Sequence, residues 1–274
     1  SVSPAILNTA FREMGLNYAF MAFDVGTDRL KDAVTGLRAL NIRGFSVSMP
    51  NKTAIIPLLD ELSPEARIIG AVNTVVNENG KFVGYNTDGV GFMRSLAEAG
   101  VRVAGRKMTL LGAGGAAVAI AVQAAFDGVS ELSIFNRQDE FFSQAAEIAA
   151  AINDRIEGVQ CKAAVYGLED QEQLKKEIAA SDILTNATSV GMKPLEGQSL
   201  IPDNSWLRPD LIVADVIYNP RKTKLLEQAE AVGCRTINGI GMVLYQGAAA
   251  FKLWTGQEMP VESIKNQLFQ LERC

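Results

Sequence analysis

The sequence predicts an α/β protein of two domains, one built on a mixed sheet and one on a doubly wound parallel sheet. Three observations support this prediction. The chain has 274 residues, of which 48% are hydrophobic, so it can form two cores of ordinary size. From Asp88 to about Asn238, apolar strand patterns alternate regularly with helical patterns. Before Asp88 they alternate only in part, which favours a mixed sheet with helices on both faces.

A glycine-rich turn with the sequence GAGGAA lies at residues 112–117, between an apolar run at 108–111 and an alanine-rich helical pattern. Glycine lets the backbone turn tightly and leaves the amides at the helix start open to a diphosphate. The small Ala117 lets the helix pack closely on the strand. The pattern alone also fits a buried turn of some other α/β protein. We expect a Rossmann-type dinucleotide-binding domain, whose cofactor contacts include Gly112, Ala113, Gly114, Gly115 and Ala116.

The next predicted strand, at 132–135, favours the dinucleotide interpretation. It ends at the sequence Asn136-Arg137-Gln138-Asp139, where a dinucleotide fold places the residues that contact the adenosine ribose. Asp139 lies somewhat beyond the spacing of about 20 residues that is usual for the acidic residue. We expect Asn136, Arg137 and Asp139 to contact the cofactor.

Local signals predict the elements of the first domain. Ser3 and Pro4 begin a helix that Gly15 ends, because serine caps a helix and proline suits its first position. Ser63 and Pro64 begin another, which reaches residue 69. Apolar periodicity and turn residues predict the rest: a strand at 18–25, a helix at 28–40, a strand at 44–48, and a hairpin of strands at 73–76 and 82–85.

The second domain is expected to contain six strands, at 108–111, 132–135, 162–166, 183–185, 211–215 and 236–238. Helical patterns at 115–126, 139–152, 169–179 and 223–232 separate them, as in a parallel, doubly wound sheet. Two last helices, around 241–255 and 261–272, have no strand left to cross over to. We therefore expect them to pack on the first domain, which gives domains of 1–87 with 240–274, and of 88–239.

Composition excludes several classes of function. The net charge of −5 provides no basic surface for nucleic acid. No run approaches the roughly 18 apolar residues of a membrane span and no charged-then-apolar leader opens the sequence, so we expect a cytoplasmic protein. The chain has no histidine, so proton transfer must fall to Lys, Asp, Glu, Tyr or Cys. Cys161, Cys234 and Cys274 lack metal-ligand spacing, and we expect reduced thiols and no metal site.

Three polar residues lie near predicted strand ends. Lys52 comes shortly after the predicted strand at 44–48, which a proline ends. Open α/β sheets bind their ligands at the carboxyl ends of such strands. Asp88 lies in the sequence GYNTDGVG, where it either carries chemistry or caps a helix. Asn73 precedes a strand and is either a ligand or a turn residue. A cation, a carboxylate and an amide together suit a polyhydroxylated substrate, although an isolated lysine after a turn is usually a surface residue.

Eight motifs in order give the sequence a resemblance to the shikimate dehydrogenase family over essentially its whole length. The motifs are SVSP at 1–4, SVSMPNK at 46–52, GAVNT at 70–74, GYNTDG at 84–89, GAGGA at 112–116, NATSVGM at 186–192, VIYNP at 216–220, and GIGM at 239–242 with QGA at 246–248. The resemblance is closest to the quinate/shikimate dehydrogenase branch.

The resemblance implies reversible hydride transfer between a nicotinamide and C3 of shikimate or quinate. Carried over by position, Lys52 is the proton donor and acceptor, and Asp88 is paired to it and to a substrate hydroxyl. The implied substrate contacts are Ser1 and Ser3 at the carboxylate, and Ser48, Asn73, Tyr218 and Gln246 at the hydroxyls or the edge. The implied cofactor contacts add Ser189, Val216 and Gly239.

The sequence departs from the family pattern at two places. Relatives normally have a strand before the Ser-x-Ser-Pro motif, whereas this sequence begins at Ser1, so we expect the first sheet to lack that strand. Phe20 stands where quinate-using relatives tend to have tyrosine, which would remove one substrate hydrogen bond.

The residues after Asn136 and Arg137 predict the cofactor. NADP-specific relatives carry a second basic residue or a threonine there, whereas this chain has Gln138 followed by the carboxylates of Asp139 and Glu140. A carboxylate accepts hydrogen bonds from a ribose diol and repels a 2′-phosphate. We therefore expect NAD as the preferred cofactor and NADP as a second one.

Two other functions stay open at this point. One is a dehydrogenase of another cyclic hydroxy acid, and the other is a dinucleotide sensor without turnover, which would not need Lys52 and Asp88. The expected partner is a small-molecule substrate, and the sequence leaves open whether the chain forms a homodimer.

Overall fold

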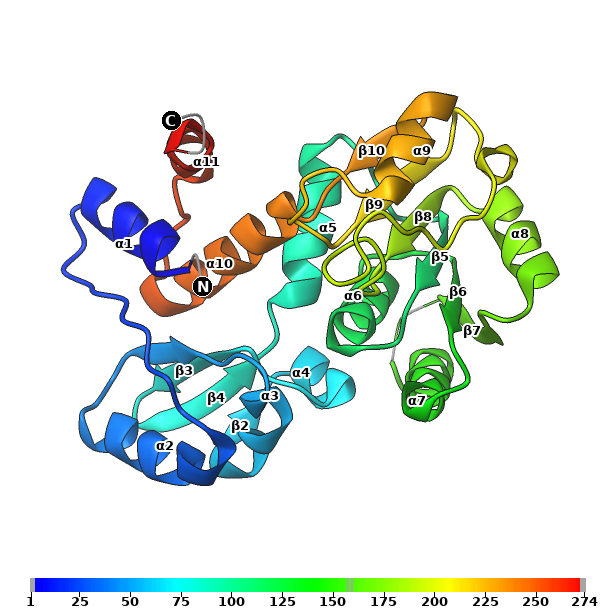
Figure 1. Cartoon of the computed structure of the whole chain (residues 1–274). Helices are drawn as coiled ribbons and strands as arrows, with labels where there is room; N and C mark the ends of the chain where they lie inside the picture. The colour runs from blue at the N-terminus through cyan, green and yellow to red at the C-terminus, as the bar shows by residue number, and fades with distance from the viewer. Residues whose placement is uncertain (1–2, 157, 159, 272–274) are drawn as a thin grey trace. The chain divides into compact units, whose positions relative to one another are not determined.

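The computed structural model describes residues 3–156, 158 and 160–271, and the chain folds into two compact units (Figure 1). The first unit contains the residues up to Gly91 and those from Leu244 onward, and Phe92–Val243 form the second. The division falls within two helices, α5 (Asp88–Glu98) and α10 (Ile240–Thr255). The chain is therefore an α/β protein whose first unit is completed by its carboxyl-terminal helices.

The first unit contains a four-stranded mixed sheet in the order β1-β3-β4-β2. β3 (Thr74–Glu78) is antiparallel to both β1 (Gly44–Ser46) and β4 (Lys81–Tyr85), whereas β2 (Glu61–Leu62) is parallel to β4. Asn79 and Gly80 join β3 to β4 with φ angles of 55° and 93°. Two positive φ angles suit the tight turn of a hairpin, for which Asn-Gly is the preferred sequence. The predicted mixed sheet and hairpin are confirmed.

The strand predicted at residues 18–25 is wrong, because this segment forms no regular secondary structure. The side chain of Asn8 takes the place of a neighbouring strand at Phe20. Its Oδ1 accepts from the Phe20 amide and its Nδ2 donates to the Phe20 carbonyl, each at 2.8 Å. When one side-chain amide pairs with both the N–H and the C=O of a residue, these groups no longer form the hydrogen bonds that would add a strand to the sheet. The fourth strand of the sheet is instead the two-residue β2.

Helices cover both faces of this sheet, because successive strand residues point to opposite sides. Val75 packs with α2 (Leu30–Ala39), α4 (Pro64–Ile69) and Ile55, which follows α3 (Asn51–Ala54), and Val76 packs with α1 (Ser3–Glu13), α10 and α11 (Val261–Leu271). On the second face, Phe11 of α1 stacks on Phe251 of α10 with their ring centroids 5.2 Å apart. Trp254 Nε1 of α10 also donates to the Val75 carbonyl at 3.0 Å.

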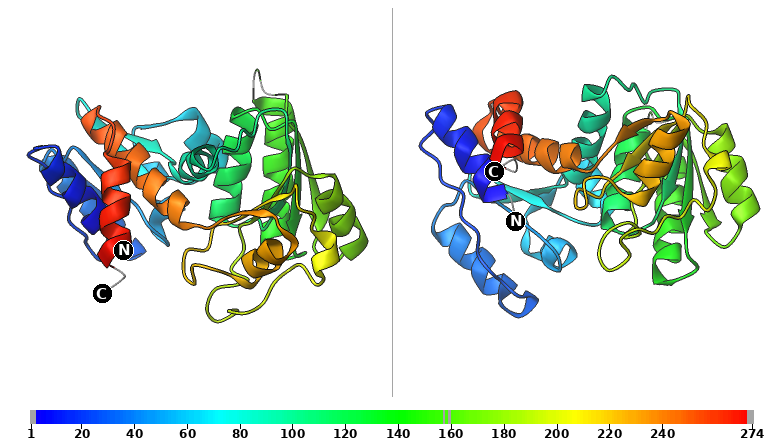
Figure 2. Two further views of the ribbon diagram at one scale, coloured as in Figure 1. Left: turned by 90° about the horizontal axis from the view of Figure 1, so that it is seen from above. Right: turned by 45° about the horizontal axis from the view of Figure 1, so that its top comes forward.

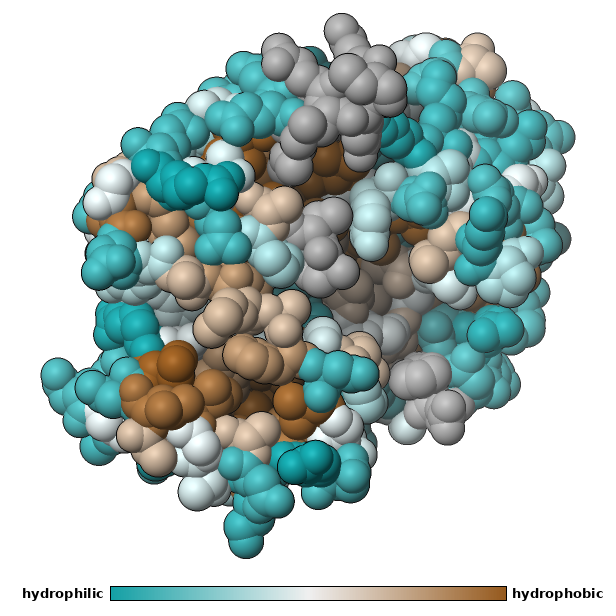
Figure 3. Space-filling model, turned by 60° about the vertical axis from the view of Figure 1, so that its left-hand side comes forward, coloured by the Kyte–Doolittle hydropathy of each residue, from teal (hydrophilic) through white to brown (hydrophobic). Residues whose placement is uncertain are grey.

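Some large apolar side chains of the first unit remain at the surface. Met21, Phe23 and Met49 are between 66% and 74% exposed. The space-filling view in Figure 3 likewise shows hydrophobic side chains gathered on part of the surface. Folded proteins expose many apolar atoms, so the exposure of these side chains alone carries no functional conclusion.

The second unit is built on a six-stranded, wholly parallel sheet in the order β10-β9-β8-β5-β6-β7. The strands are β5 (Lys107–Leu111), β6 (Glu131–Asn136), β7 (Lys162–Gly167), β8 (Ile183–Asn186), β9 (Ile212–Asp215) and β10 (Arg235–Ile237). The chain starts in the middle at β5, reaches the edge at β7 and then returns to β8. The direction of winding therefore reverses between β5 and β8, where a doubly wound sheet binds its ligand.

Helices lie on both faces of the parallel sheet (Figure 2). Leu110 and Ile134 face α6 (Gly115–Phe126) and α7 (Glu140–Arg155). The alternate residues Leu111 and Phe135 face α8 (Gln171–Ala180) and α9 (Lys224–Val232). Because the inner strands β5, β6, β8 and β9 are buried on both sides, their sequences are mostly apolar. The predicted doubly wound domain is confirmed.

A buried ion pair joins α8 to the parallel sheet. Glu177 of α8 is 7% exposed, and its Oε2 lies 2.7 Å from both Lys107 Nζ and Ser133 Oγ. Burial alone would raise the pKa of Glu177, but the hydrogen bonds from Lys107 and Ser133 outweigh burial and lower the pKa below its ordinary value. Glu177 therefore stabilises the fold at neutral pH, and this contribution is lost as the pH falls through its folded-state pKa.

We expect Glu177→Gln to lower the free energy of unfolding by about 1–3 kcal/mol near pH 7, because the charge-assisted hydrogen bonds are lost. The difference in the free energy of unfolding between the variant and the wild type should shrink below about pH 4.5, because the wild-type Glu177 carboxylate takes up a proton there and loses its charge. Urea unfolding across this pH range measures both effects. Glu172→Gln, an exposed change in the first turn of the same helix, is the control. If the difference in the free energy of unfolding did not depend on pH, the stabilising role of the Glu177 charge would be contradicted.

Candidate active site

Lys52 and Asp88 meet at one edge of the mixed sheet. β1 and β4 run in the same direction, because each is antiparallel to β3, so their carboxyl ends share an edge. Lys52 lies on α3, which follows β1, and Asp88 begins α5, which follows β4. Lys52 Nζ is 2.6 Å from Asp88 Oδ2, and the two side chains are 23% and 15% exposed. The sheet thus holds an ammonium and a carboxylate together while leaving both accessible.

Asn73 fixes the orientation of this pair. It is 5% exposed and immediately precedes β3, at the same edge of the sheet. Its Nδ2 donates to Asp88 Oδ1 at 2.8 Å. Its Oδ1 accepts from the Thr87 amide at 2.9 Å and from the Thr74 hydroxyl at 3.0 Å. Both Asp88 oxygens are therefore engaged, one by Asn73 and one by Lys52.

The contacts of Asp88 favour the chemical interpretation over the capping one. Its carboxylate oxygens contact Lys52 and Asn73, and its own amide donates to Asn86 Oδ1 at 3.1 Å. The Val72 amide donates to the Lys52 carbonyl at 2.8 Å, which attaches α3 to the segment that carries Asn73. The local backbone thus holds all three side chains in place.

The other predicted substrate contacts come from several segments of the two units. In the first unit, Ser48 is exposed, and Ser3 and Gln246 are partly buried on α1 and α10. Tyr218 belongs to the second unit, where it is 53% exposed. Ser1 lies outside the described residues. The structure therefore brings together Lys52, Asp88 and Asn73 from the predicted set.

The glycine turn of the second unit has the geometry of a diphosphate cradle. Gly112 has a φ of 107°, and a Cβ there would lie 2.9 Å from the Ala187 carbonyl oxygen, so the turn requires glycine. Gly114 is the N-cap of α6 and provides no side chain to cap the helix. A Cβ at Gly114 or Gly115 would meet nothing within 4 Å. The start of α6 is therefore uncrowded and reaches the surface at Gly115, as binding of a diphosphate to its amides requires.

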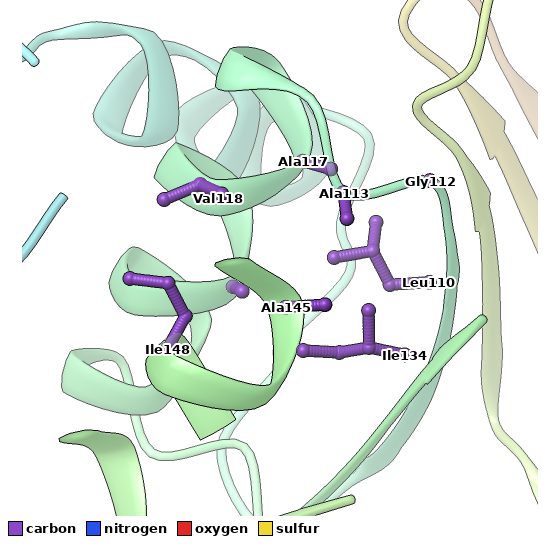
Figure 4. A pocket seen from close by; sticks show the side chains of 9 residues that line it. Leu110, Gly112, Ala113, Ala117, Val118, Ile134, Ala145 and Ile148 are labelled. Atoms are coloured by element: carbon purple, nitrogen blue, oxygen red, sulfur yellow. The ribbon is translucent and has the colours of Figure 1, made fainter. Parts of the chain in front are cut away.

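Small residues let α6 approach the sheet behind this turn. Ala113 and Ala117 are almost fully buried. Figure 4 shows them beside Leu110 and Ile134 of the sheet, around a small apolar space that Ile148 of α7 also lines. Because apolar groups surround it, this space belongs to the core. The cradle is the open side of the turn, not this cavity.

The turn after β6 presents a carboxylate and a guanidinium. The buried Asn136 donates through Nδ2 to Asp139 Oδ1 at 2.9 Å and to the Arg137 carbonyl at 2.9 Å. Arg137 is 78% exposed, and its Nε lies 3.7 Å from Asp139 Oδ2. Asn136 thus sets the shape of the turn, and Asp139 and Arg137 form its polar surface. A carboxylate and a guanidinium are groups that can contact an adenosine ribose and its substituents.

A buried carboxylate that the sequence reasoning missed organises two further loops. Asp215, at the end of β9, is 1% exposed and accepts from Asn186 Nδ2 at 3.1 Å, the Ile217 amide at 3.0 Å and Thr223 Oγ1 at 2.7 Å. Burial raises the pKa of Asp215. An acid that ends an apolar strand directly before the VIYNP motif is the signal that could have identified it.

These loops carry the remaining predicted cofactor contacts. Asn186 Nδ2 also donates to the Val190 carbonyl, so the Asp215 network fixes the loop that contains Ser189. Val216 follows Asp215 directly, and a Cβ at Gly239 would lie against the Val216 carbonyl oxygen. Glycine at this position is therefore required by close approach of the two backbones.

Three further observations concern metal ligands, membrane spans and thiols. Within the described residues, no group of three or more His, Cys, Asp or Glu side chains can hold a metal ion. In the same part of the chain, no helix has the length and apolar character to cross a bilayer. Cys161 and Cys234 are free and buried, and burial raises the pKa of Cys161 to about 11. Cys274 lies outside the described residues.

Comparisons with known proteins agree with this geometry. The profile of the shikimate dehydrogenase substrate binding domain matches residues 1–75, and that of the shikimate 5′-dehydrogenase C-terminal domain matches residues 239–269. A shikimate dehydrogenase (NADP(+)) from Listeria monocytogenes serotype 4b is 57% identical over 269 residues, which is 98% of this chain and 91% of the relative.

Solved structures agree as well. A shikimate 5-dehydrogenase from Listeria monocytogenes, in complex with shikimate and NAD, matches with a TM-score of 0.95 at 57% identity, covering 98% of this chain and 92% of that one. A quinate dehydrogenase from Corynebacterium glutamicum, in complex with NAD, matches with a TM-score of 0.85 at 31% identity, covering 98% and 94%. As the order of its motifs predicted, the chain belongs to the shikimate dehydrogenase family.

Proposed function

We propose that the chain catalyses the reversible, NAD(P)-dependent oxidation of the C3 hydroxyl of shikimate to a ketone. The observation that carries this proposal is the cluster of Lys52, Asp88 and Asn73 at one sheet edge, with Lys52 Nζ 2.6 Å from Asp88. A dinucleotide sensor would not need this pair. Similarity to a shikimate dehydrogenase and to a structure that holds shikimate and NAD supports the choice of substrate.

The bound nicotinamide supplies the hydride in one direction and accepts it in the other. Reduction of the ketone builds negative charge on its oxygen, and the Lys52 ammonium can both stabilise that charge and donate the proton. In the reverse direction, neutral Lys52 takes the hydroxyl proton. Asp88 orients Lys52 through their ion pair, and Asn73 holds the carboxylate in position.

We also propose quinate as a second substrate, since a quinate dehydrogenase is 31% identical to the chain. Phe20 has no hydroxyl that could form a hydrogen bond with the substrate. Its ring packs against Trp254, with the ring centroids 5.8 Å apart. Shikimate should therefore be used better than quinate. Assays of a panel of cyclic hydroxy acids separate this proposal from a dehydrogenase with another substrate.

Replacing Lys52 by alanine should lower kcat about 10²–10⁴-fold, because the proton donor is removed. NAD binding should stay within about twofold of wild type. Steady-state kinetics with shikimate and fluorescence titration with NADH measure the two effects. Lys81→Ala is the matched control, because Lys81 also lies 2.6 Å from a carboxylate, that of Glu61, but is exposed. Unchanged turnover in Lys52→Ala would refute the assignment.

Gly114→Asp separates a ligand-binding role of the glycine turn from a structural one. Gly114 has an extended backbone with φ of −70°, and aspartate is a favoured N-cap, so the variant should fold with undiminished thermal stability. Its carboxylate would occupy the diphosphate position, and NAD should bind at least about tenfold more weakly because of like-charge repulsion. Gly114→Ala is the uncharged control. Wild-type NAD affinity in Gly114→Asp would argue against the cradle.

We propose NAD as the preferred cofactor, with NADP as a weaker one. Asp139 accepts from Asn136, and this fixed carboxylate can accept from a ribose diol but repels a 2′-phosphate. Arg137 is already 3.7 Å from the same carboxylate, so part of its charge is neutralised. The relative from Listeria monocytogenes is named for NADP(+), and the matching structure holds NAD.

The ratio of kcat/KM for NAD over NADP should therefore exceed one, and Asp139→Asn should lower it by roughly tenfold, because an uncharged side chain tolerates a 2′-phosphate. Initial rates with shikimate at matched ionic strength give both ratios. An NADP preference of a hundredfold in the wild type, about 2.7 kcal/mol, would overturn the proposed cofactor choice.

A further inference from the structure

A second carboxylate lies against the turn after β6. Glu169 follows β7, 31 positions beyond Gln138 in the sequence, and its Oε1 accepts from the Gln138 backbone amide at 3.3 Å. The register of the sheet explains the contact. β6 pairs in parallel with β7, with Asn136 opposite Gly167, so the turns that follow the two strands are neighbours.

The backbone at Gly167 leaves room for this carboxylate. A Cβ at Gly167 would lie 2.9 Å from Glu169 Oε2 and 3.4 Å from the Gln138 side-chain nitrogen. Glu169 therefore folds back over Gly167, where an added side chain would make its carboxylate shift. The Leu168 amide donates to the Asn136 carbonyl at 2.9 Å, which attaches the segment that carries Glu169 to the turn.

This contact changes what the turn can bind. A backbone amide beside an arginine is the kind of donor that receives a ribose 2′-phosphate, and here the Gln138 amide already donates to a carboxylate of the protein. A 2′-phosphate at this turn would have to displace that carboxylate and would still meet its negative charge. A ribose 2′-hydroxyl carries no charge and escapes this repulsion.

We propose that Glu169 is a specificity-determining residue that disfavours dinucleotides with a 2′-phosphate. This inference rests on the proposed dinucleotide function and adds to it a residue outside the turn that the sequence motif marks. Asp139 lies on the turn itself, whereas Glu169 acts from the neighbouring strand end. The two carboxylates contact different groups of the turn, the Asn136 side chain and the Gln138 amide.

Binding of two cofactor fragments to the full chain tests this proposal without turnover. Calorimetry should compare adenosine 2′,5′-bisphosphate with adenosine 5′-monophosphate in the wild type, Glu169→Gln and Glu169→Ala. The glutamine variant should bind the bisphosphate roughly three- to fivefold more tightly, because Glu169 is exposed and its field is screened. The alanine variant, which also frees the Gln138 amide, should gain more, up to about tenfold.

Two controls distinguish specificity from a structural role. Affinity for adenosine 5′-monophosphate should stay within about twofold in both variants, and the gain for the bisphosphate should shrink in about 0.5 M salt. Glu172→Gln, an exposed change of the same charge three residues along the chain, should show no such gain. An unchanged fragment ratio, weaker binding of both fragments, or an equal gain in Glu172→Gln would overturn the proposal.

Failure of the proposed function gives a different result. If the folded wild type binds neither fragment, the dinucleotide site itself is refuted, and this inference falls with it. Binding of both fragments with a ratio that Glu169 does not change leaves the proposed function intact and removes only the role of Glu169.

Discussion

An ion pair held at the edge of a mixed sheet is the interaction on which the proposed chemistry depends. Lys52 and Asp88 are partly buried, and desolvation of two charges offsets most of their mutual attraction, so the pair is a weak source of stability. The structure nevertheless uses the buried Asn73 to fix it, with Thr74 and Thr87 holding that asparagine. Such control of orientation is typical of groups that act on a substrate.

In the second unit the physical requirement is different, because a backbone must come close to an anion. Gly112 permits the turn, Gly114 leaves the helix start uncapped, and Ala117 allows close packing behind it. The adjoining loops depend on the buried Asp215 at the end of β9, which joins Asn186 at the end of β8 to Thr223. Binding is thus prepared by backbone geometry, whereas the chemistry of the first unit is prepared by side chains.

Sequence patterns predicted the parallel sheet well, because its strands are buried on both faces and their apolar runs leave little ambiguity. They failed at residues 18–25, where an apolar run typical of a strand forms none, and the side chain of Asn8 pairs with the backbone of Phe20. They also missed β2, which is too short to have a pattern. Lys52 and Asp88 could be named from motifs, but the contacts of Glu169 and Asp215 arise from strand register, which local sequence does not encode.

The most direct test of the central claim is a crystal structure of the chain with shikimate and an oxidised dinucleotide bound together. We predict that the Lys52 ammonium and one Asp88 carboxylate oxygen both lie within about 3.2 Å of the substrate C3 oxygen, the reach of a hydrogen bond. A C3 oxygen more than about 5 Å from Lys52, with no water between them, would contradict the role of this pair in proton transfer.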